Sequence, residues 1–116
     1  MRKDLLTKRR RVAFVDEKLA KSFDDLSKGT FEEKQLCAFI SRALDDILED
    51  PWRYIQIQRD KWPKEFIRKY NVPNLWKYDL PNGWRLIYTI HEHEVNILAI
   101  ILEWFPHKEY EGRFGY

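Results

Sequence analysis

The segment Val95–Trp104 (VNILAIILEW) carries apolar side chains at both odd and even positions. Successive side chains of a strand point to opposite faces, so a strand of this composition is typical of the interior of a sheet. We therefore expect a central strand, covered on one side by helices. In a chain of 116 residues this segment constrains the fold more than any other, because the remaining elements have to be arranged around it.

Two amphipathic helices are predicted earlier in the chain, over residues 16–28 and 31–49. Apolar residues recur in the first at spacings of four and three, and the pattern stops at Gly29. Thr30 begins the second helix, and Glu33, three residues later, completes the signature of a capping box. We expect the two helices to form an αα-hairpin.

The predicted strands surround this hairpin in the sequence. A short β-branched and aromatic run, RVAFV, favours a first strand before the helices, and three further strands follow them in an antiparallel meander. A short helix is expected to begin at Pro63. The sequence therefore predicts an α+β fold in one domain, residues 1–116, with a basic N-terminal tail over residues 1–10. The predicted strands are Arg11–Val15, Leu75–Leu80, Trp84–His91 and Val95–Trp104.

The turn Pro81-Asn82-Gly83 leaves two registers open for the first hairpin of the meander. A two-residue Asn-Gly turn would place Lys77 and Arg85 on opposite faces of the sheet. A three-residue loop, with proline and asparagine in a type I turn and only the glycine in the left-handed region, places them on one face beside Asp79. The turn residues favour the three-residue loop.

Composition and charge exclude several classes of protein. Cys37 is the only cysteine, so neither a disulfide framework nor a multi-cysteine metal site is expected. No apolar run approaches the ~20 residues that span a bilayer, and no secretory signal pattern is found, so we expect a cytoplasmic protein without membrane contact. Residues 51–90 hold eight positive and three negative side chains, whereas residues 16–50 hold five and ten. This uneven distribution suggests one face for a polyanion, and an ordinary solvated surface is the alternative.

The segment after the apolar strand carries residues suited to acid–base chemistry. His107 comes directly after it and is followed by Lys108, Tyr110 and Arg113. A histidine, a tyrosine and cations at a strand end can supply a general acid, a general base and a phosphate clamp, although a polar tail is the alternative. No metal site is expected at the histidines of residues 91–93, which favour a solvated turn.

Basic and aromatic residues alternate over residues 52–77, a pattern that single-stranded nucleic-acid surfaces use. Lys61 and Lys64 lie within this region, and together with Arg113 they are the predicted RNA-binding cations. The alternative is that most of these rings belong to the core of a small domain.

The strand Gly83-Trp84-Arg85-Leu86-Ile87-Tyr88 resembles the Gly-Tyr-Arg-apolar-apolar-Tyr strand of the RelE/ParE superfamily of type II toxins. The order strand, two helices and three antiparallel strands over about residues 11–110 is similar as well. The resemblance to the RelE branch implies an endonuclease that cuts mRNA on the ribosome and is neutralised by a cognate antitoxin. In that branch the ribose 2′-OH attacks the adjacent phosphate without a metal or other cofactor.

The resemblance also implies roles for individual residues. Arg85 matches the arginine that contacts the scissile phosphate, and Lys77 matches the first of two lysines on the preceding strand. Asp79 stands where the second lysine is expected, which is a departure from the pattern. His107 and Lys108 resemble the basic pair after the last strand.

Tyr110 or Tyr116 corresponds to the C-terminal tyrosine of the RelE branch. Two other functions remain open: a non-catalytic or ParE-like member of the fold that acts by binding a protein, and a small RNA-binding module.

Overall fold

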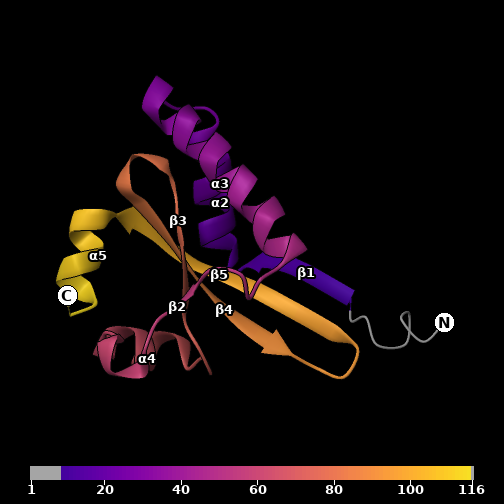
Figure 1. Ribbon diagram of the computed structural model, residues 1–116. Helices are drawn as coiled ribbons and strands as arrows, with labels where there is room; N and C mark the ends of the chain where they lie inside the picture. Colours follow the sequence, from indigo (N-terminus) through magenta and orange to yellow (C-terminus); the bar gives the residue numbers. More distant parts are fainter. Residues whose placement is uncertain (1–8, 116) are drawn as a thin grey trace.

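The computed structural model describes residues 9–115, which form a five-stranded mixed sheet with helices on both faces (Figure 1). The strand order is β1-β5-β4-β3-β2. No helix within residues 9–115 is long and apolar enough to cross a membrane. The predicted α+β class is confirmed. The elements are β1 (Arg9–Phe14), α2 (Glu17–Leu26), α3 (Phe31–Glu49), β2 (Ile55–Gln56), the 3₁₀ turn η1 (Arg59–Lys61), α4 (Lys64–Tyr70), β3 (Trp76–Asp79), the 3₁₀ turn η2 (Pro81–Gly83), β4 (Trp84–Glu92), β5 (Asn96–Pro106) and α5 (His107–Arg113).

The predicted αα-hairpin is confirmed as α2 and α3, and each helix begins at a capped residue. The Asp16 side chain accepts a hydrogen bond from the backbone N–H of Leu19 at the start of α2. At the start of α3, Thr30 and Glu33 accept each other's backbone N–H groups, which completes the predicted capping box. These side chains satisfy N–H groups that a helix leaves without an internal partner.

One hydrophobic core lies between this hairpin and the sheet. The α3 residues that contact the sheet are fully buried, whereas the apolar residues of α2 are half-buried because α2 packs at the edge of the same core. Burying a leucine or isoleucine side chain contributes ~1.5–3 kcal/mol relative to leaving it in water. Helix α3 therefore contributes more to the stability of this core than α2 does. The buried residues of α3 are Leu36, Ile40, Ala43 and Ile47.

Strand β5 lies in the interior of the sheet, second from the β1 edge, whereas β4 occupies the central position that was expected for β5. It pairs with β4 in an antiparallel arrangement and with β1 in a parallel one, so the meander β3-β4-β5 is confirmed and the first strand of the chain extends it. A β-bulge interrupts the pairing of β4 and β5 between Ile87 and Tyr88. The edge opposite β1 is completed by the two-residue β2, which is not among the predicted strands.

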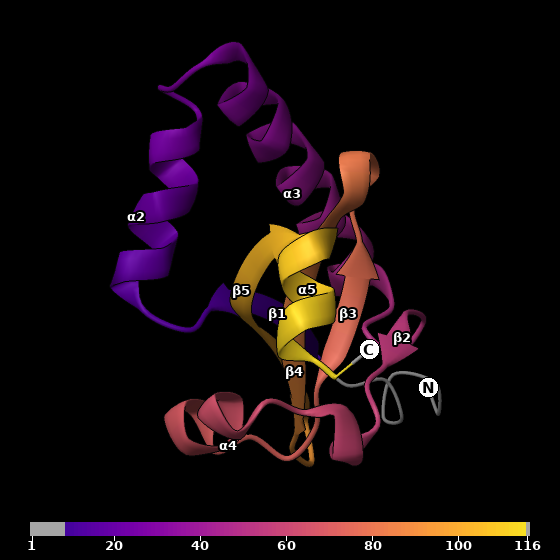
Figure 2. The ribbon, with the colours of Figure 1, turned by 90° about the vertical axis from the view of Figure 1, so that its left-hand side faces the viewer.

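The second face of the sheet differs from the expectation that helices cover one side only. Helices α4 and α5 cover it, and Figure 2 shows α5 lying across the strands. Phe66 of α4, Tyr110 of α5 and Phe114, which follows the end of α5, are at most 2% exposed within this second core. The helix α5 was missed because its residues are mostly polar, with only Tyr110 turned inward.

The predicted tail also has structure where it meets the sheet. Arg9 and Arg10 belong to β1, and the Arg10 guanidinium donates to the backbone carbonyl of Glu49 at 2.6 Å, near the end of α3. A cation is favourable there because the last carbonyls of a helix carry partial negative charge. Residues 1–8 of the predicted tail lie outside the described residues.

The β3–β4 hairpin has the register of the three-residue loop. Asp79 pairs with Arg85, Lys77 pairs with Ile87, and the Leu80 N–H donates to the Trp84 carbonyl at 2.8 Å. The predicted type I turn is wrong at Asn82. Asn82 has a φ of 61°, so both it and Gly83, with a φ of 77°, occupy the left-handed region. Asparagine and glycine are the residues that adopt this conformation most readily.

The loop therefore depends on its glycine. Gly83→Ala should lower the free energy of unfolding by about 1–2 kcal/mol, because a Cβ is strained at this φ. Steric clash adds little to this destabilisation, because the added Cβ would lie 3.8 Å from the Cβ of His107, an ordinary van der Waals distance. Urea unfolding followed by circular dichroism measures the change. Asn82→Gly, at a φ that glycine also adopts, is the matched control, and equal destabilisation by both variants would contradict this account.

Candidate active site

Two cations and one carboxylate meet where β3 and β4 leave their shared turn. Asp79 Oδ1 lies 3.0 Å from Arg85 Nε and 3.3 Å from Lys77 Nζ, so a single oxygen holds both cations. The Lys77 and Arg85 side chains are only 17% and 14% exposed, whereas Asp79 is 45% exposed. The three-residue register produces this cluster, because it turns all three side chains to the face that α5 covers.

His107 reaches the same cluster from the C-terminal end of β5. Trp84 pairs with Pro106 across the sheet, which brings the first residue of α5 beside the start of β4. The His107 Nδ1 atom lies 2.7 Å from Arg85 Nη2, and Nε2 lies 3.2 Å from Glu111 Oε2 one turn along α5. Asp79, Arg85, His107 and Glu111 therefore form a continuous chain of polar contacts.

The partners of His107 define its tautomer. A guanidinium has donors only, so Nδ1 accepts from Arg85 and is unprotonated. The ring proton then lies on Nε2, where it is donated to Glu111. This assignment is inferred from the hydrogen-bond partners, as it is for any histidine whose hydrogens are not observed. It leaves a basic lone pair directed at the arginine.

Lys108 and Tyr110 follow His107 on α5 but have different surroundings. Lys108 is exposed. Tyr110 is 2% exposed, and its ring stacks on Phe114 with centroids 4.6 Å apart. The Lys77 ammonium lies 5.0 Å from the centroid of the Tyr110 ring, within the range of a cation–π contact. The ring of Tyr110 thus forms the inner wall of the cation cluster, and Tyr116 lies outside the described residues.

The predicted RNA-binding cations lie elsewhere. Lys61 belongs to η1, with Nζ 3.5 Å from the carbonyl of Gly115, and Lys64 is exposed at the start of α4. The structure therefore brings together Lys77, Arg85 and His107, with Tyr110 behind them and Lys108 beside them.

Arg113 is held between three carboxylates. Its guanidinium lies 2.8 Å from Glu65, 2.9 Å from Glu103 and 3.1 Å from Glu109. Burial lowers its pKa, but hydrogen bonds to Glu103 and Glu65 outweigh that effect and raise the pKa above its usual value. Arg113 thus joins α5 to α4 and β5, and binding a phosphate would require it to leave these partners.

Sequence reasoning missed Glu111. Glu111 comes four residues after His107, and residues at this spacing lie on the same side of a helix. The contact could have been predicted if the segment had been recognised as helical. Within residues 9–115, no group of three or more histidine, cysteine, aspartate or glutamate side chains could hold a metal ion.

Comparison with known proteins gives a single structural similarity. No protein-family model matches the chain, and no curated protein matches its sequence. Among solved structures, the chain is similar to a mutant of the Escherichia coli toxin RelE in its free state, at 19% sequence identity and a TM-score of 0.46. The similarity covers 90% of this chain and 92% of the other. At this level it carries no information on the activity of individual residues.

The tautomer of His107 is directly measurable. In ¹⁵N spectra at neutral pH, we expect Nδ1 to give the shift of an unprotonated nitrogen and Nε2 that of a protonated one. Arg85→Met should remove this preference, since Nδ1 then loses its donor. Lys77→Met, which leaves the arginine in place, is the control. A proton on Nδ1 in the unaltered protein would contradict the contact with Arg85.

Proposed function

We propose that this chain is a RelE-like toxin, an endonuclease that cuts mRNA on the ribosome in the cytoplasm. The observation that carries the proposal is the 2.7 Å contact between His107 and Arg85, beside Lys77. It joins a group that can accept a proton to two cations that can hold a phosphate. The resemblance of the Gly83–Tyr88 strand to the RelE branch supports the same chemistry.

Cleavage by the substrate's own 2′-OH needs three contributions. The 2′ oxygen forms a bond to the phosphorus while the bond to the 5′ oxygen breaks, leaving a 2′,3′-cyclic phosphate. The proton of the 2′-OH passes to His107 Nδ1, whose lone pair becomes available when Arg85 turns to the phosphate. Lys108, exposed on the same turn of α5, donates a proton to the leaving 5′ oxygen. Arg85 and Lys77 stabilise the charge of the phosphorane.

Asp79 competes with the phosphate for both cations. Ion pairs to a carboxylate that is 45% exposed are weak, ~0.2–1 kcal/mol, because water screens them. A phosphate that bridges the same two cations can therefore displace the carboxylate, but the negative charge of Asp79 remains nearby and opposes the developing charge on the phosphorane. We expect the unaltered protein to be a slow nuclease for this reason.

An antitoxin partner follows from the same proposal. Residues 51–90 carry a net charge of +5, and such a surface attracts an acidic segment at a rate that falls with salt. We propose that the cognate antitoxin binds across these residues and withholds the cations from mRNA.

Removing Arg85, the cation proposed to bind the phosphate, tests the proposed activity. Arg85→Ala should reduce cleavage in a ribosome-programmed assay about 10²–10³-fold, and should relieve growth arrest on expression, because the phosphorane loses a directed donor. His107→Ala should reduce it about 10²–10⁴-fold if His107 is the base. Arg42→Ala, which removes an exposed arginine from α3, outside residues 51–90, is the matched control and should leave cleavage unchanged.

Two results would contradict this proposal. If the unaltered protein cleaves no mRNA under any programming and does not affect growth, the binding-only function remains. If cleavage survives both Arg85→Ala and His107→Ala in folded protein, the nuclease has a different site.

The carboxylate of Asp79 gives a second test. Asp79→Lys should increase the cleavage rate, because it replaces a competing anion with a third cation beside Lys77 and Arg85. Asp79→Asn removes only the charge and should give a smaller increase. Single-turnover cleavage rates measure both variants, and circular dichroism checks that they fold. A lower rate in folded Asp79→Asn would show that the carboxylate positions the arginine instead of inhibiting it.

A further inference from the structure

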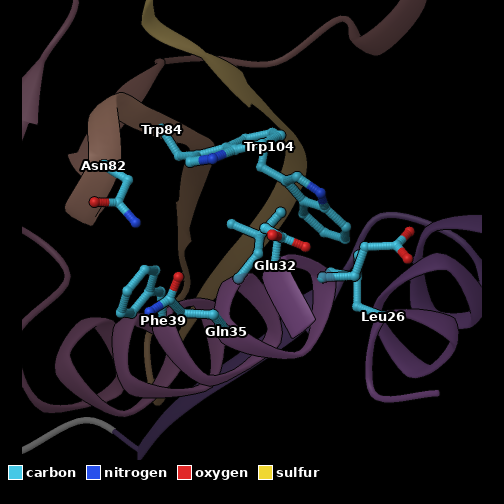
Figure 3. A pocket seen from close by; sticks show the side chains of 9 residues that line it. Leu26, Glu32, Gln35, Phe39, Asn82, Trp84 and Trp104 are labelled. Atoms are coloured by element: carbon cyan, nitrogen blue, oxygen red, sulfur yellow. The ribbon is translucent and has the colours of Figure 1, made fainter. Parts of the chain in front are cut away.

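A hollow of about 320 Å³ lies on the face of the sheet opposite the candidate active site. It is bounded by the αα-hairpin on one side and by the turn between β3 and β4 on the other. Figure 3 shows the indoles of Trp84 and Trp104 along one wall and Phe39 of α3 on the other, with Asn82 at one end and Leu26 of α2 at the other. We call this hollow the tryptophan pocket.

The pocket presents aromatic rings to an incoming group. Trp84, Trp104 and Phe39 are all partly exposed, in contrast to the aromatic residues of the second core. Trp104 is supported from behind by Phe14, whose ring centroid lies 6.3 Å away in an edge-on arrangement. The faces of such rings carry partial negative charge and attract cations, and the indole of tryptophan attracts them most strongly.

Carboxylates complete the chemistry of the pocket. Glu32 and Glu33 line it, and no lysine or arginine is among its nine lining residues. Glu33 is engaged in the capping box, where its Oε1 accepts the Thr30 N–H at 2.8 Å. Glu32 is exposed and supplies the charge that an incoming cation would meet.

We propose that the tryptophan pocket binds the arginine side chain of a basic segment in a partner protein. A guanidinium stacks flat on an indole while its edge donates to a carboxylate, which suits this combination of Trp84, Trp104 and Glu32 better than a lysine ammonium does. Apolar residues beside that arginine would cover Leu26 and Phe39.

A segment, as opposed to a small molecule, fits the surface around the pocket. A second hollow, of about 410 Å³, shares Phe39 with the pocket and is also lined by Tyr78, Asp46 and Arg42, whose Nε lies 3.7 Å from Asp46 Oδ1. Phe31, at the start of α3, is 75% exposed next to Glu32 and extends the apolar surface past the pocket. A chain lying along α3 would therefore contact both hollows. The whole of α3 carries five carboxylates against two cations, which favours a basic occupant.

This surface is independent of the proposed nuclease. Trp84 and Arg85 are neighbours in β4, but their side chains point to opposite faces of the sheet. Either proposal can therefore fail without the other.

The probe for the pocket is the capped tripeptide acetyl-Leu-Arg-Leu-amide, titrated into ¹⁵N-labelled full-length protein. We expect the indole N–H signals of Trp84 and Trp104 to shift, while those of Trp52, Trp62 and Trp76 do not. The same peptide with citrulline in place of arginine, which keeps the shape and removes the charge, should bind about three- to tenfold more weakly. Glu32→Gln should weaken binding of the arginine peptide by a similar factor.

The matched control is Glu49→Gln, which removes a carboxylate from the far end of α3 and should leave the affinity unchanged. Circular dichroism confirms that each variant folds. Equal affinity for the arginine and citrulline peptides would overturn the proposal in favour of a purely apolar site. Absence of any shift at Trp84 and Trp104 would overturn it as well. Concentration-dependent shifts of these two signals without peptide would assign the pocket to a second copy of the chain.

Discussion

The pairing of β4 with β5 is the interaction on which the rest of the structure depends. Both strands carry apolar side chains on both faces, so each face requires its own cover. The αα-hairpin buries one face, and α4 and α5 bury the other, with Leu86 on the first side and Ile87 on the second. Both hydrophobic cores therefore contain side chains from these two strands. Loss of this pairing would separate the layers on both sides at once.

The residues of the candidate active site lie where the helices no longer cover both faces of the sheet. At the turn between β3 and β4 the strands extend past the second core, and Arg85 and Lys77 retain partial access to water there. Their low exposure restricts the movement of both side chains, and the half-exposed Asp79 balances part of their charge. The first residue of α5 then adds a histidine. The arrangement is a preorganised set of charges at the edge of a packed core, the kind of place where electrostatic effects are stronger than in bulk water.

Local patterns in the sequence predicted much of this fold. The capping box, the two-sided apolar strand and the Pro-Asn-Gly turn each reflect short-range physics, and they gave the hairpin, the interior position of β5 and the register that joins Lys77 to Arg85. The second core could not be predicted in this way. It is built by Phe66, Tyr110 and Phe114 from short polar helices whose apolar positions are too few to show a period. For the same reason the sequence named His107 and Arg85 as candidates without predicting their contact, and Glu111 was not expected at all.

The parallel pairing of β1 with β5 joins distant parts of the sequence. Arg9 pairs with Asn96, and Phe14 pairs with Ile101, so the first strand has no partner until the last strand has been synthesised. Pairings of this range are slow to form because a long loop must be closed first. The same late segment delivers His107. A nascent chain therefore emerges from the ribosome with its sheet incomplete and its proposed cleavage site unassembled. If the proposed arrest of translation is its activity, this order of assembly would spare the ribosome that is making it.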